Sequence, residues 1–157
     1  QLRHWTLIPM YLLLVSNFYP AAGQVVDYWF VEVLVQLLLA LAAVFALPAA
    51  QRSHTAIYTE NYGQAGAIDF YGPALGLPKA ISGHLNYFYW GPRDYTGESV
   101  LLLGVDASEA RQVFNSVQIV GHAGHRYAMS SENFPILLAT EPKIPLPELW
   151  PQVKTWQ

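Results

Sequence analysis

Hydrophobic positions are unevenly distributed, and the first third of the chain is almost continuously apolar. The segment from Val25 to Pro48 contains only two charged residues, Asp27 and Glu32. About 20 helical residues cross a bilayer hydrocarbon core about 30 Å thick. The pattern therefore predicts a membrane-spanning helix, with Trp29 suited to the interface between lipid and water. A buried core helix is the alternative interpretation.

A second apolar run, from Trp5 to Tyr19, is short for a membrane crossing and contains Pro9. A signal peptide is one interpretation, but Arg3 is its only firm positive charge and a longer apolar segment follows. The run is better interpreted as a membrane-embedded or interfacial helix. Residues 1–50 are thus expected to be membrane-embedded, and residues 51–157 to form an extracytoplasmic domain.

After residue 50 the pattern changes to short apolar segments punctuated by glycine and proline. The segment 99–105 is continuously apolar except for its ends, which is typical of a strand buried on both faces. Strands alternating with helices imply right-handed crossovers. We therefore predict an α/β fold: one or more N-terminal membrane helices, then a small three-layer domain with a mainly parallel sheet. The expected strands are 54–58, 79–82, 99–105, 117–122 and 134–140. The expected helices are one capped by Asn61 and stopped at Gly72, and two more at 109–114 and 147–154.

The stretch from Thr59 to Gly72 indicates a strand, a tight turn and a helix. Asn61 is a favourable N-cap, Gly63 permits a tight turn, and Gly66 lets the helix lie close to the strand. Ligands of open α/β sheets bind where a strand leads into a helix. The residues expected to face such a ligand are Glu60, Asn61, Tyr62 and Gln64. Nucleotide binding is disfavoured, because Gly63 and Gly66 supply only half of a dinucleotide fingerprint.

Histidines and a serine suggest two kinds of chemistry, and neither is well supported. His122 and His125 could share a metal ion with Glu132, but no regular element fixes them, so we predict no metal site. Ser82 lies two residues before His84, yet the nucleophile elbow of hydrolases is missing. No catalytic residue is assigned within this chain.

The aromatic run 87–90, preceded by Asn86, is a candidate binding surface. Tyrosine and tryptophan have apolar bodies and polar tips, which suit a sugar face or a lipid headgroup region. The alternative is that some of these rings pack beneath the sheet.

Composition excludes several functional classes. The chain of 157 residues has no cysteine, so neither disulfides nor thiolate metal sites can form. Only 12% of its residues are charged, the net charge is -3, and 53% are hydrophobic. The sequence has no basic patch that could neutralise phosphates, and we therefore expect no nucleic-acid partner.

An ordered set of motifs resembles the C-terminal region of bacterial membrane glycosyltransferases that use polyprenyl-phosphate sugars, the protein mannosyltransferase and aminoarabinose transferase relatives. The resemblance covers about 57–156. It is carried by the segments 60–72, 76–78, 81–84, 89–92, 131–136 and 145–151.

The resemblance implies a parent protein with many membrane helices, located in the bacterial cytoplasmic (inner) membrane, with this domain on the periplasmic side. It also implies inverting sugar transfer by a carboxylate base in an early loop that this chain lacks, with a divalent metal or basic residues of the parent holding the phosphate. No cofactor is expected in this fragment. The implied partners are membrane lipid, a lipid-linked sugar and the rest of the parent protein.

The domain itself is expected to support the transferase by recognising an acceptor or headgroup. The expected substrate-binding residues are Glu60, Asn61, Tyr62, Gln64, Ser82, His84, Asn86, Trp90, Glu132 and Asn133. The glycines expected at structural turns are Gly63, Gly66, Gly72, Gly83 and Gly91. The alternative function is a non-enzymatic, membrane-anchored module that binds a small ligand.

Overall fold

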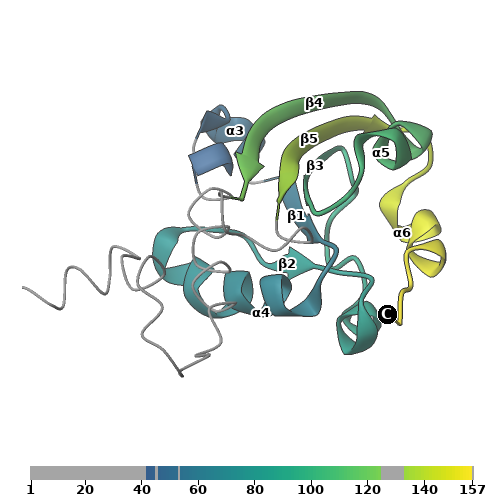
Figure 1. The fold of residues 1–157 in the computed structure, drawn as a ribbon, viewed down its shortest axis with the longest axis horizontal. Coiled ribbons are helices and arrows are strands. Elements are labelled where there is room, and N and C mark those ends of the chain that lie inside the picture. Colours follow the sequence, from purple (N-terminus) through teal and green to yellow (C-terminus); the bar gives the residue numbers. More distant parts are fainter. Residues whose placement is uncertain (1–41, 45, 53, 125–132, 157) are drawn as a thin grey trace, which may run out of the picture.

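The computed structural model describes residues 42–44, 46–52, 54–124 and 133–156, which form an α/β domain around one five-stranded sheet (Figure 1). The strand order is β2-β1-β3-β5-β4. The strands are β1 (Thr55–Thr59), β2 (Ala80–Ile81), β3 (Ser99–Leu103), β4 (Phe114–Ala123) and β5 (Phe134–Pro142). The α-helices are α3 (Ala49–Arg52), α4 (Tyr62–Tyr71), α5 (Ala107–Val113) and α6 (Leu146–Leu149), and the 3-10 helices are η2 (Gly72–Leu75), η3 (Leu85–Trp90) and η5 (Trp150–Gln152).

The first three strands form the parallel part of the sheet. β1 pairs in parallel with β2 on one side and with β3 on the other, where Thr59 lies opposite Leu103. Helix α4 connects β1 to β2. Its ends follow the sequence closely, because the Asn61 side chain accepts a hydrogen bond from the Gly63 N–H at 2.6 Å and the helix ends at Gly72.

The prediction of a mainly parallel sheet is wrong, because β5 runs antiparallel to both of its neighbours. The sheet is mixed, with two parallel and two antiparallel strand pairings. The physical reason is the short connection between β4 and β5. Antiparallel strands can be joined by a hairpin, whereas a parallel pair needs a crossover of a dozen or more residues.

Only the end of the predicted membrane segments is described, and there Ala43, Val44 and Leu47 are buried, with Ala43 and Val44 in the core beneath α4. The segments 5–19 and 25–41 lie outside the described residues, as do positions 45 and 53. Within the described parts of the chain, no helix is long and apolar enough to span a bilayer. The fold class is therefore corrected to an α/β domain with a mixed five-stranded sheet.

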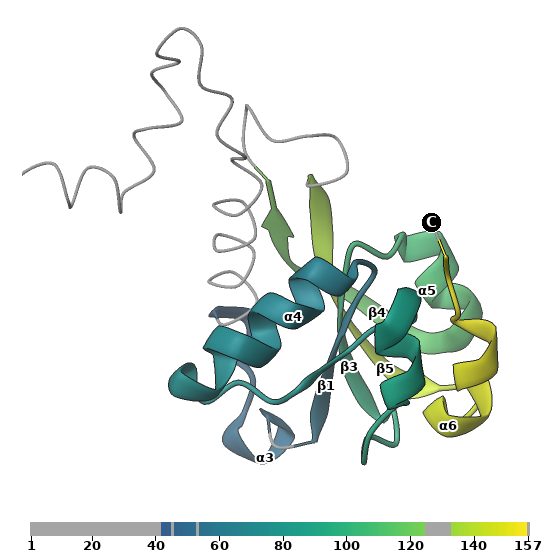
Figure 2. The ribbon, with the colours of Figure 1, turned by 90° about the horizontal axis from the view of Figure 1, so that it is seen from below.

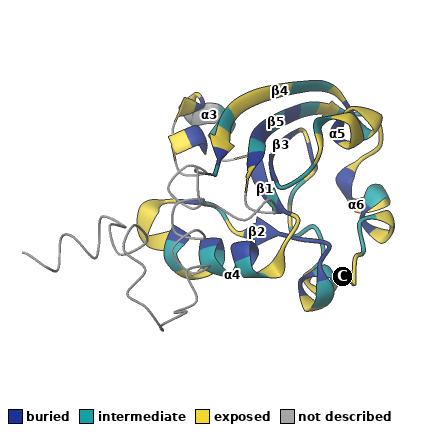
Figure 3. Ribbon diagram, viewed as in Figure 1, coloured by how far each residue is buried: buried dark blue, intermediate teal, exposed yellow. Residues whose placement is uncertain are grey.

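Alternate residues of each strand point to opposite sides of the sheet. Both sides are covered by other elements. Figure 2 shows α4 on one side of the strands and α5 and α6 on the other. The core beneath α4 includes Ile57, Ala65, Ile68, Leu101, Leu103 and Ile136. The core on the other face includes Ala56, Val100, Leu102, Ala110, Leu137, Leu146 and Trp150. Figure 3 shows that burial is concentrated in the central strands, whereas the outer strand β4 is largely exposed.

The C-terminal elements depart from the sequence prediction in length. The expected helix at 147–154 is the short α6 followed by the 3-10 turn η5. Its position is fixed by Trp150, whose Nε1–H donates to the carbonyl of Phe88 at 2.9 Å. The chain then pairs with the segment after β2: Thr155 N–H donates to the Gly83 carbonyl at 2.9 Å, and Leu85 N–H donates to the Thr155 carbonyl at 3.0 Å.

Candidate functional site

The carboxyl ends of β1 and β3 form a topological switch point. β1 continues through α4 to β2 on one side, and β3 continues through α5 towards β4 on the other. In open α/β sheets, neighbouring strands with such diverging connections are where ligands bind. The two strand ends are joined by the Glu60 N–H, which donates to the Leu103 carbonyl at 3.0 Å.

His84 reaches this switch point from the segment after β2. Its Nδ1 accepts a hydrogen bond at 3.3 Å from the backbone N–H of Tyr62, and the two rings lie 5.2 Å apart. The imidazole is buried, and the His84 N–H donates to the hydroxyl of Ser82 at 3.2 Å. Because Nδ1 acts as an acceptor, a neutral His84 carries its proton on Nε2. Nε2–H is therefore a donor that these contacts leave for a ligand.

Glu60 is electrostatically linked to its neighbours. Glu60 is exposed as a residue, but partial burial of its carboxyl group raises its pKa, the charge of Glu109 raises it further, and His84 lowers it. Burial also raises the pKa of Tyr58, a hydrogen bond with the Gly83 backbone lowers it, and Glu60 and Glu109 raise it. The contact of His84 with Tyr62 and these electrostatic effects together define one group of side chains, which we call the β1–β3 edge site: Tyr58, Glu60, Tyr62, His84 and Glu109.

A close approach of two backbone segments defines the floor of the site. Gly104, directly after β3, has a φ of +88°, and a Cβ there would lie 3.0 Å from both Cβ and Oε2 of Glu60. A side chain at this position would thus be strained and would press on Glu60. The glycine keeps the Glu60 carboxylate at the strand ends.

The other residues predicted at the α4 terminus have different roles. The Asn61 side chain serves as the helix N-cap, so its Oδ1 is occupied by Gly63. Gln64 is only 5% exposed, and its Oε1 has no hydrogen-bond partner. Leaving a buried acceptor unsatisfied costs about 1–3 kcal/mol. Gln64 is therefore a polar residue that the described contacts do not explain.

The remaining predicted substrate-binding residues are not brought together at the β1–β3 edge site. Ser82 is fully buried, and its hydroxyl accepts a hydrogen bond from the His84 backbone N–H. Asn86 and Trp90 are exposed on η3, where the Trp90 ring packs 4.3 Å from that of Tyr87. Asn133 is exposed before β5, and Glu132 lies outside the described residues.

The glycines predicted at turns occupy different backbone positions in the structure. Gly91 has a φ of +70°, which favours glycine, whereas Gly63 and Gly66 lie inside α4. Gly72 is the αR C-cap of that helix. At Gly83, a Cβ would overlap the carbonyl oxygen of Val153.

No cation site is formed by the described residues, among which no group of histidine and acidic side chains could hold a metal ion. His122 is exposed on β4. The two other members of the metal hypothesis, His125 and Glu132, lie outside the described residues.

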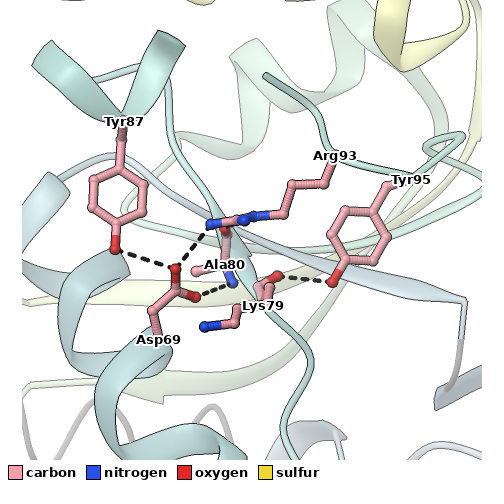
Figure 4. A network of polar contacts seen from close by, with 6 residues as sticks. All are labelled: Asp69, Lys79, Ala80, Tyr87, Arg93 and Tyr95. Atoms are coloured by element: carbon pink, nitrogen blue, oxygen red, sulfur yellow. Dashed lines mark hydrogen bonds and ion pairs between the residues drawn. The ribbon is translucent and has the colours of Figure 1, made fainter. Parts of the chain in front are cut away.

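A polar network that the sequence did not predict holds the surrounding elements in place (Figure 4). Asp69 of α4 accepts from the Ala80 N–H at 2.8 Å, from Arg93 at 2.9 Å and from the Tyr87 hydroxyl at 3.4 Å. Arg93 Nε also donates to the Ala80 carbonyl at 2.9 Å. Burial and Asp69 raise the pKa of Tyr87 to about 12. The network ties α4 to β2 and η3, and so fixes the segment that carries His84.

We expect Asp69→Ala to lower the free energy of unfolding by about 2 kcal/mol, because it leaves the Ala80 N–H and one terminal nitrogen of the partly buried Arg93 without their acceptor. Chemical denaturation measures the change. Asp94→Ala, at an exposed aspartate nearby, is the control and should change stability little. Equal effects of the two substitutions would contradict the role of the network.

We expect Glu60→Gln to stabilise the fold at neutral pH. A raised carboxyl pKa means that the folded state disfavours the charged form, so the contribution of Glu60 is most favourable at low pH and falls as pH rises through its folded pKa. The melting temperature of the variant should therefore exceed that of the wild type more at pH 7 than at pH 4. Glu98→Gln, at an exposed glutamate before β3, is the control. A gap that does not grow with pH would contradict the assignment.

Sequence reasoning missed Tyr58 and Glu109. Tyr58 was predicted to lie in the strand 54–58. The alternation of apolar and polar residues along a strand does not show which of its side chains lie near a ligand. Glu109 lies on α5, about fifty residues further along the chain, and only the parallel pairing of β1 with β3 brings it near Glu60.

The fold and the site together define an α/β domain with a polar cluster at its switch point. Comparison with protein-family models, with curated proteins and with solved structures finds no match. The resemblance to polyprenyl-phosphate-sugar-dependent transferases thus remains a prediction from the motifs.

Proposed function

We propose that the domain recognises a small hydroxylated ligand at the β1–β3 edge site, as the acceptor- or headgroup-recognition part of a polyprenyl-phosphate-sugar-dependent membrane glycosyltransferase. The observation that supports this most is the meeting of Glu60, Tyr62 and His84 at the switch point. The motif resemblance supplies the transferase context, with the domain on the periplasmic side of the bacterial inner membrane.

The chemistry of the three side chains suits a ring that carries hydroxyl groups. The Glu60 carboxylate accepts hydrogen bonds, and His84 Nε2–H donates one. The Tyr62 side chain is 50% exposed and offers an apolar face with a polar tip. An acceptor, a donor and a flat apolar surface together match a sugar better than a purely apolar ligand.

Two exposed aromatic residues of the same helix provide a matched test in the full-length transferase. We expect Tyr62→Ala to lower turnover without lowering the amount of enzyme, because the ring lies beside His84. Phe70→Ala should leave turnover unchanged, since Phe70 is 77% exposed and contacts Tyr71 rather than the site. Equal turnover of both variants and the wild type would remove the proposal.

The transferase context has a separate test. Reading the gene upstream of Gln1 should show a long frame of hydrophobic segments that includes the catalytic loop. A start codon close to Gln1 would instead favour the non-enzymatic binding module, with the same ligand-binding edge.

A further inference from the structure

A cluster of aromatic rings around one lysine is formed by η3 and the C-terminal residues, and it shares no residue with the β1–β3 edge site. Lys154 Nζ is 4.8 Å from the ring centroid of Phe88, 4.8 Å from that of Tyr89 and 4.5 Å from that of Trp156. It also donates to the Tyr89 hydroxyl at 3.3 Å. We call these four residues, Phe88, Tyr89, Lys154 and Trp156, the aromatic–lysine surface.

The surface is held on a rigid backbone. The pairing of Thr155 with Gly83 and Leu85 fixes the last residues of the chain beside η3. Beneath the surface, Phe88 stacks on Trp150 with ring centroids 5.9 Å apart and planes 8° apart. The exposed rings are therefore pre-organised rather than carried on a loose end.

Two of these rings remain open to solvent despite their contacts. The side chains of Tyr89 and Trp156 are 63% and 60% exposed. The described contacts of Lys154 Nζ are to rings and a phenol, not to a carboxylate. The surface thus combines amphipathic rings with a positive charge that no described anion neutralises.

We propose that the aromatic–lysine surface docks on an anionic phospholipid bilayer. Tyrosine and tryptophan are the residues that favour the boundary between hydrocarbon and headgroups, because one end of the ring is apolar and the other forms hydrogen bonds. The Lys154 ammonium group lies among these rings and supplies the positive charge that attracts lipid phosphates.

Docking through this surface would orient the domain, because the surface lies near only one of the two outer edges of the sheet. β2 lies at one edge, with the Gly83–Thr155 pairing directly after it, and β4 lies at the other. The proposal places the β2 edge against the bilayer and the β4 edge away from it. It does not depend on ligand binding at the β1–β3 edge site.

The absence of cysteine from the chain allows a direct test with single labels. Thr155→Cys and the matched control Gln118→Cys, exposed on β4, carry an environment-sensitive fluorophore on the full chain mixed with phosphatidylcholine–phosphatidylglycerol vesicles. We expect the label at 155 to shift to shorter wavelength, to be quenched by nitroxide lipid and to be protected from iodide. The label at 118 should stay accessible to iodide. Equal behaviour of the two labels would overturn the proposal.

A charge variant tests the role of the lysine. Adding Lys154→Glu to Thr155→Cys should abolish the quenching by nitroxide lipid, and vesicles of phosphatidylcholine alone should weaken it in the parent label. Circular dichroism establishes that the variant is folded; if it is not, Lys154→Gln should lower the quenched fraction about fivefold in the linear range. Quenching that is independent of the lysine and of lipid charge would overturn the proposal. Protection of the label at 155 by D-mannose without vesicles would assign the surface to a sugar instead.

Discussion

Gly83→Ala is expected to lower the free energy of unfolding by about 3 kcal/mol, while Gly66→Ala raises it by about 0.5–1 kcal/mol. A Cβ at position 83 would overlap the Val153 carbonyl oxygen and lie 2.7 Å from its carbon. These are backbone atoms, so the C-terminal segment must move away. That movement breaks both hydrogen bonds of Thr155.

The two glycines differ in what surrounds them. A Cβ at Gly66 would lie 3.8 Å from the Tyr87 hydroxyl, which is an ordinary contact, and Gly66 lies inside α4 where alanine is the better helix former. Urea denaturation of both variants measures the opposite signs. A Gly83→Ala variant as stable as the wild type would show that the C-terminal segment is not docked as the structure has it.

His84→Asn is expected to weaken acceptor binding about 10- to 100-fold, the size of a hydrogen bond to a charged or strongly polar group of about 1.5–3 kcal/mol. The asparagine oxygen can take the position of Nδ1 and still accept from the Tyr62 N–H. It cannot replace the Nε2–H donor. The variant should therefore keep the melting temperature of the wild type and lose affinity, measured as the KM of the proposed full-length transferase for its proposed acceptor.

Two further variants separate capping from ligand binding. His84→Gln carries a donor near the position of Nε2 and should retain more affinity than His84→Asn, at some loss of stability. His122→Asn, at an exposed histidine on β4, is the control and should change neither. An unchanged KM in His84→Asn, or the same change in His122→Asn, would contradict a ligand contact by His84.

Local structure was the part of the fold that the sequence predicted well. The N-cap at Asn61, the helix end at Gly72 and the fully buried strand β3 follow from capping, glycine and hydrophobic pattern within a few residues. Asp106 caps α5, because its carboxylate accepts a hydrogen bond from the Ser108 N–H at 2.6 Å. Each of these features depends on neighbours in the chain.

Strand direction could not be predicted in the same way. β5 is an apolar run whose pattern fits either direction, and its antiparallel pairing with β3 comes from the hairpin with β4. The sequence rule that strands alternating with helices are parallel fails for β5, which pairs antiparallel with both β3 and β4. A wrong direction for one strand, β5, was therefore enough to give the wrong sheet type.

The sequence by itself located the strands β1, β3 and β5 and the helix α4 to within a few residues, and it placed Glu60 and Tyr62 where β1 leads into α4. Only the tertiary structure decided that Tyr58 and Glu109 join them, that Asn61 is occupied as a cap, and that the C-terminal residues fix the His84 segment. The physical reason is the range of the interactions. Capping and hydrophobic periodicity act over a few residues, whereas sheet pairing and burial bring together groups tens of residues apart.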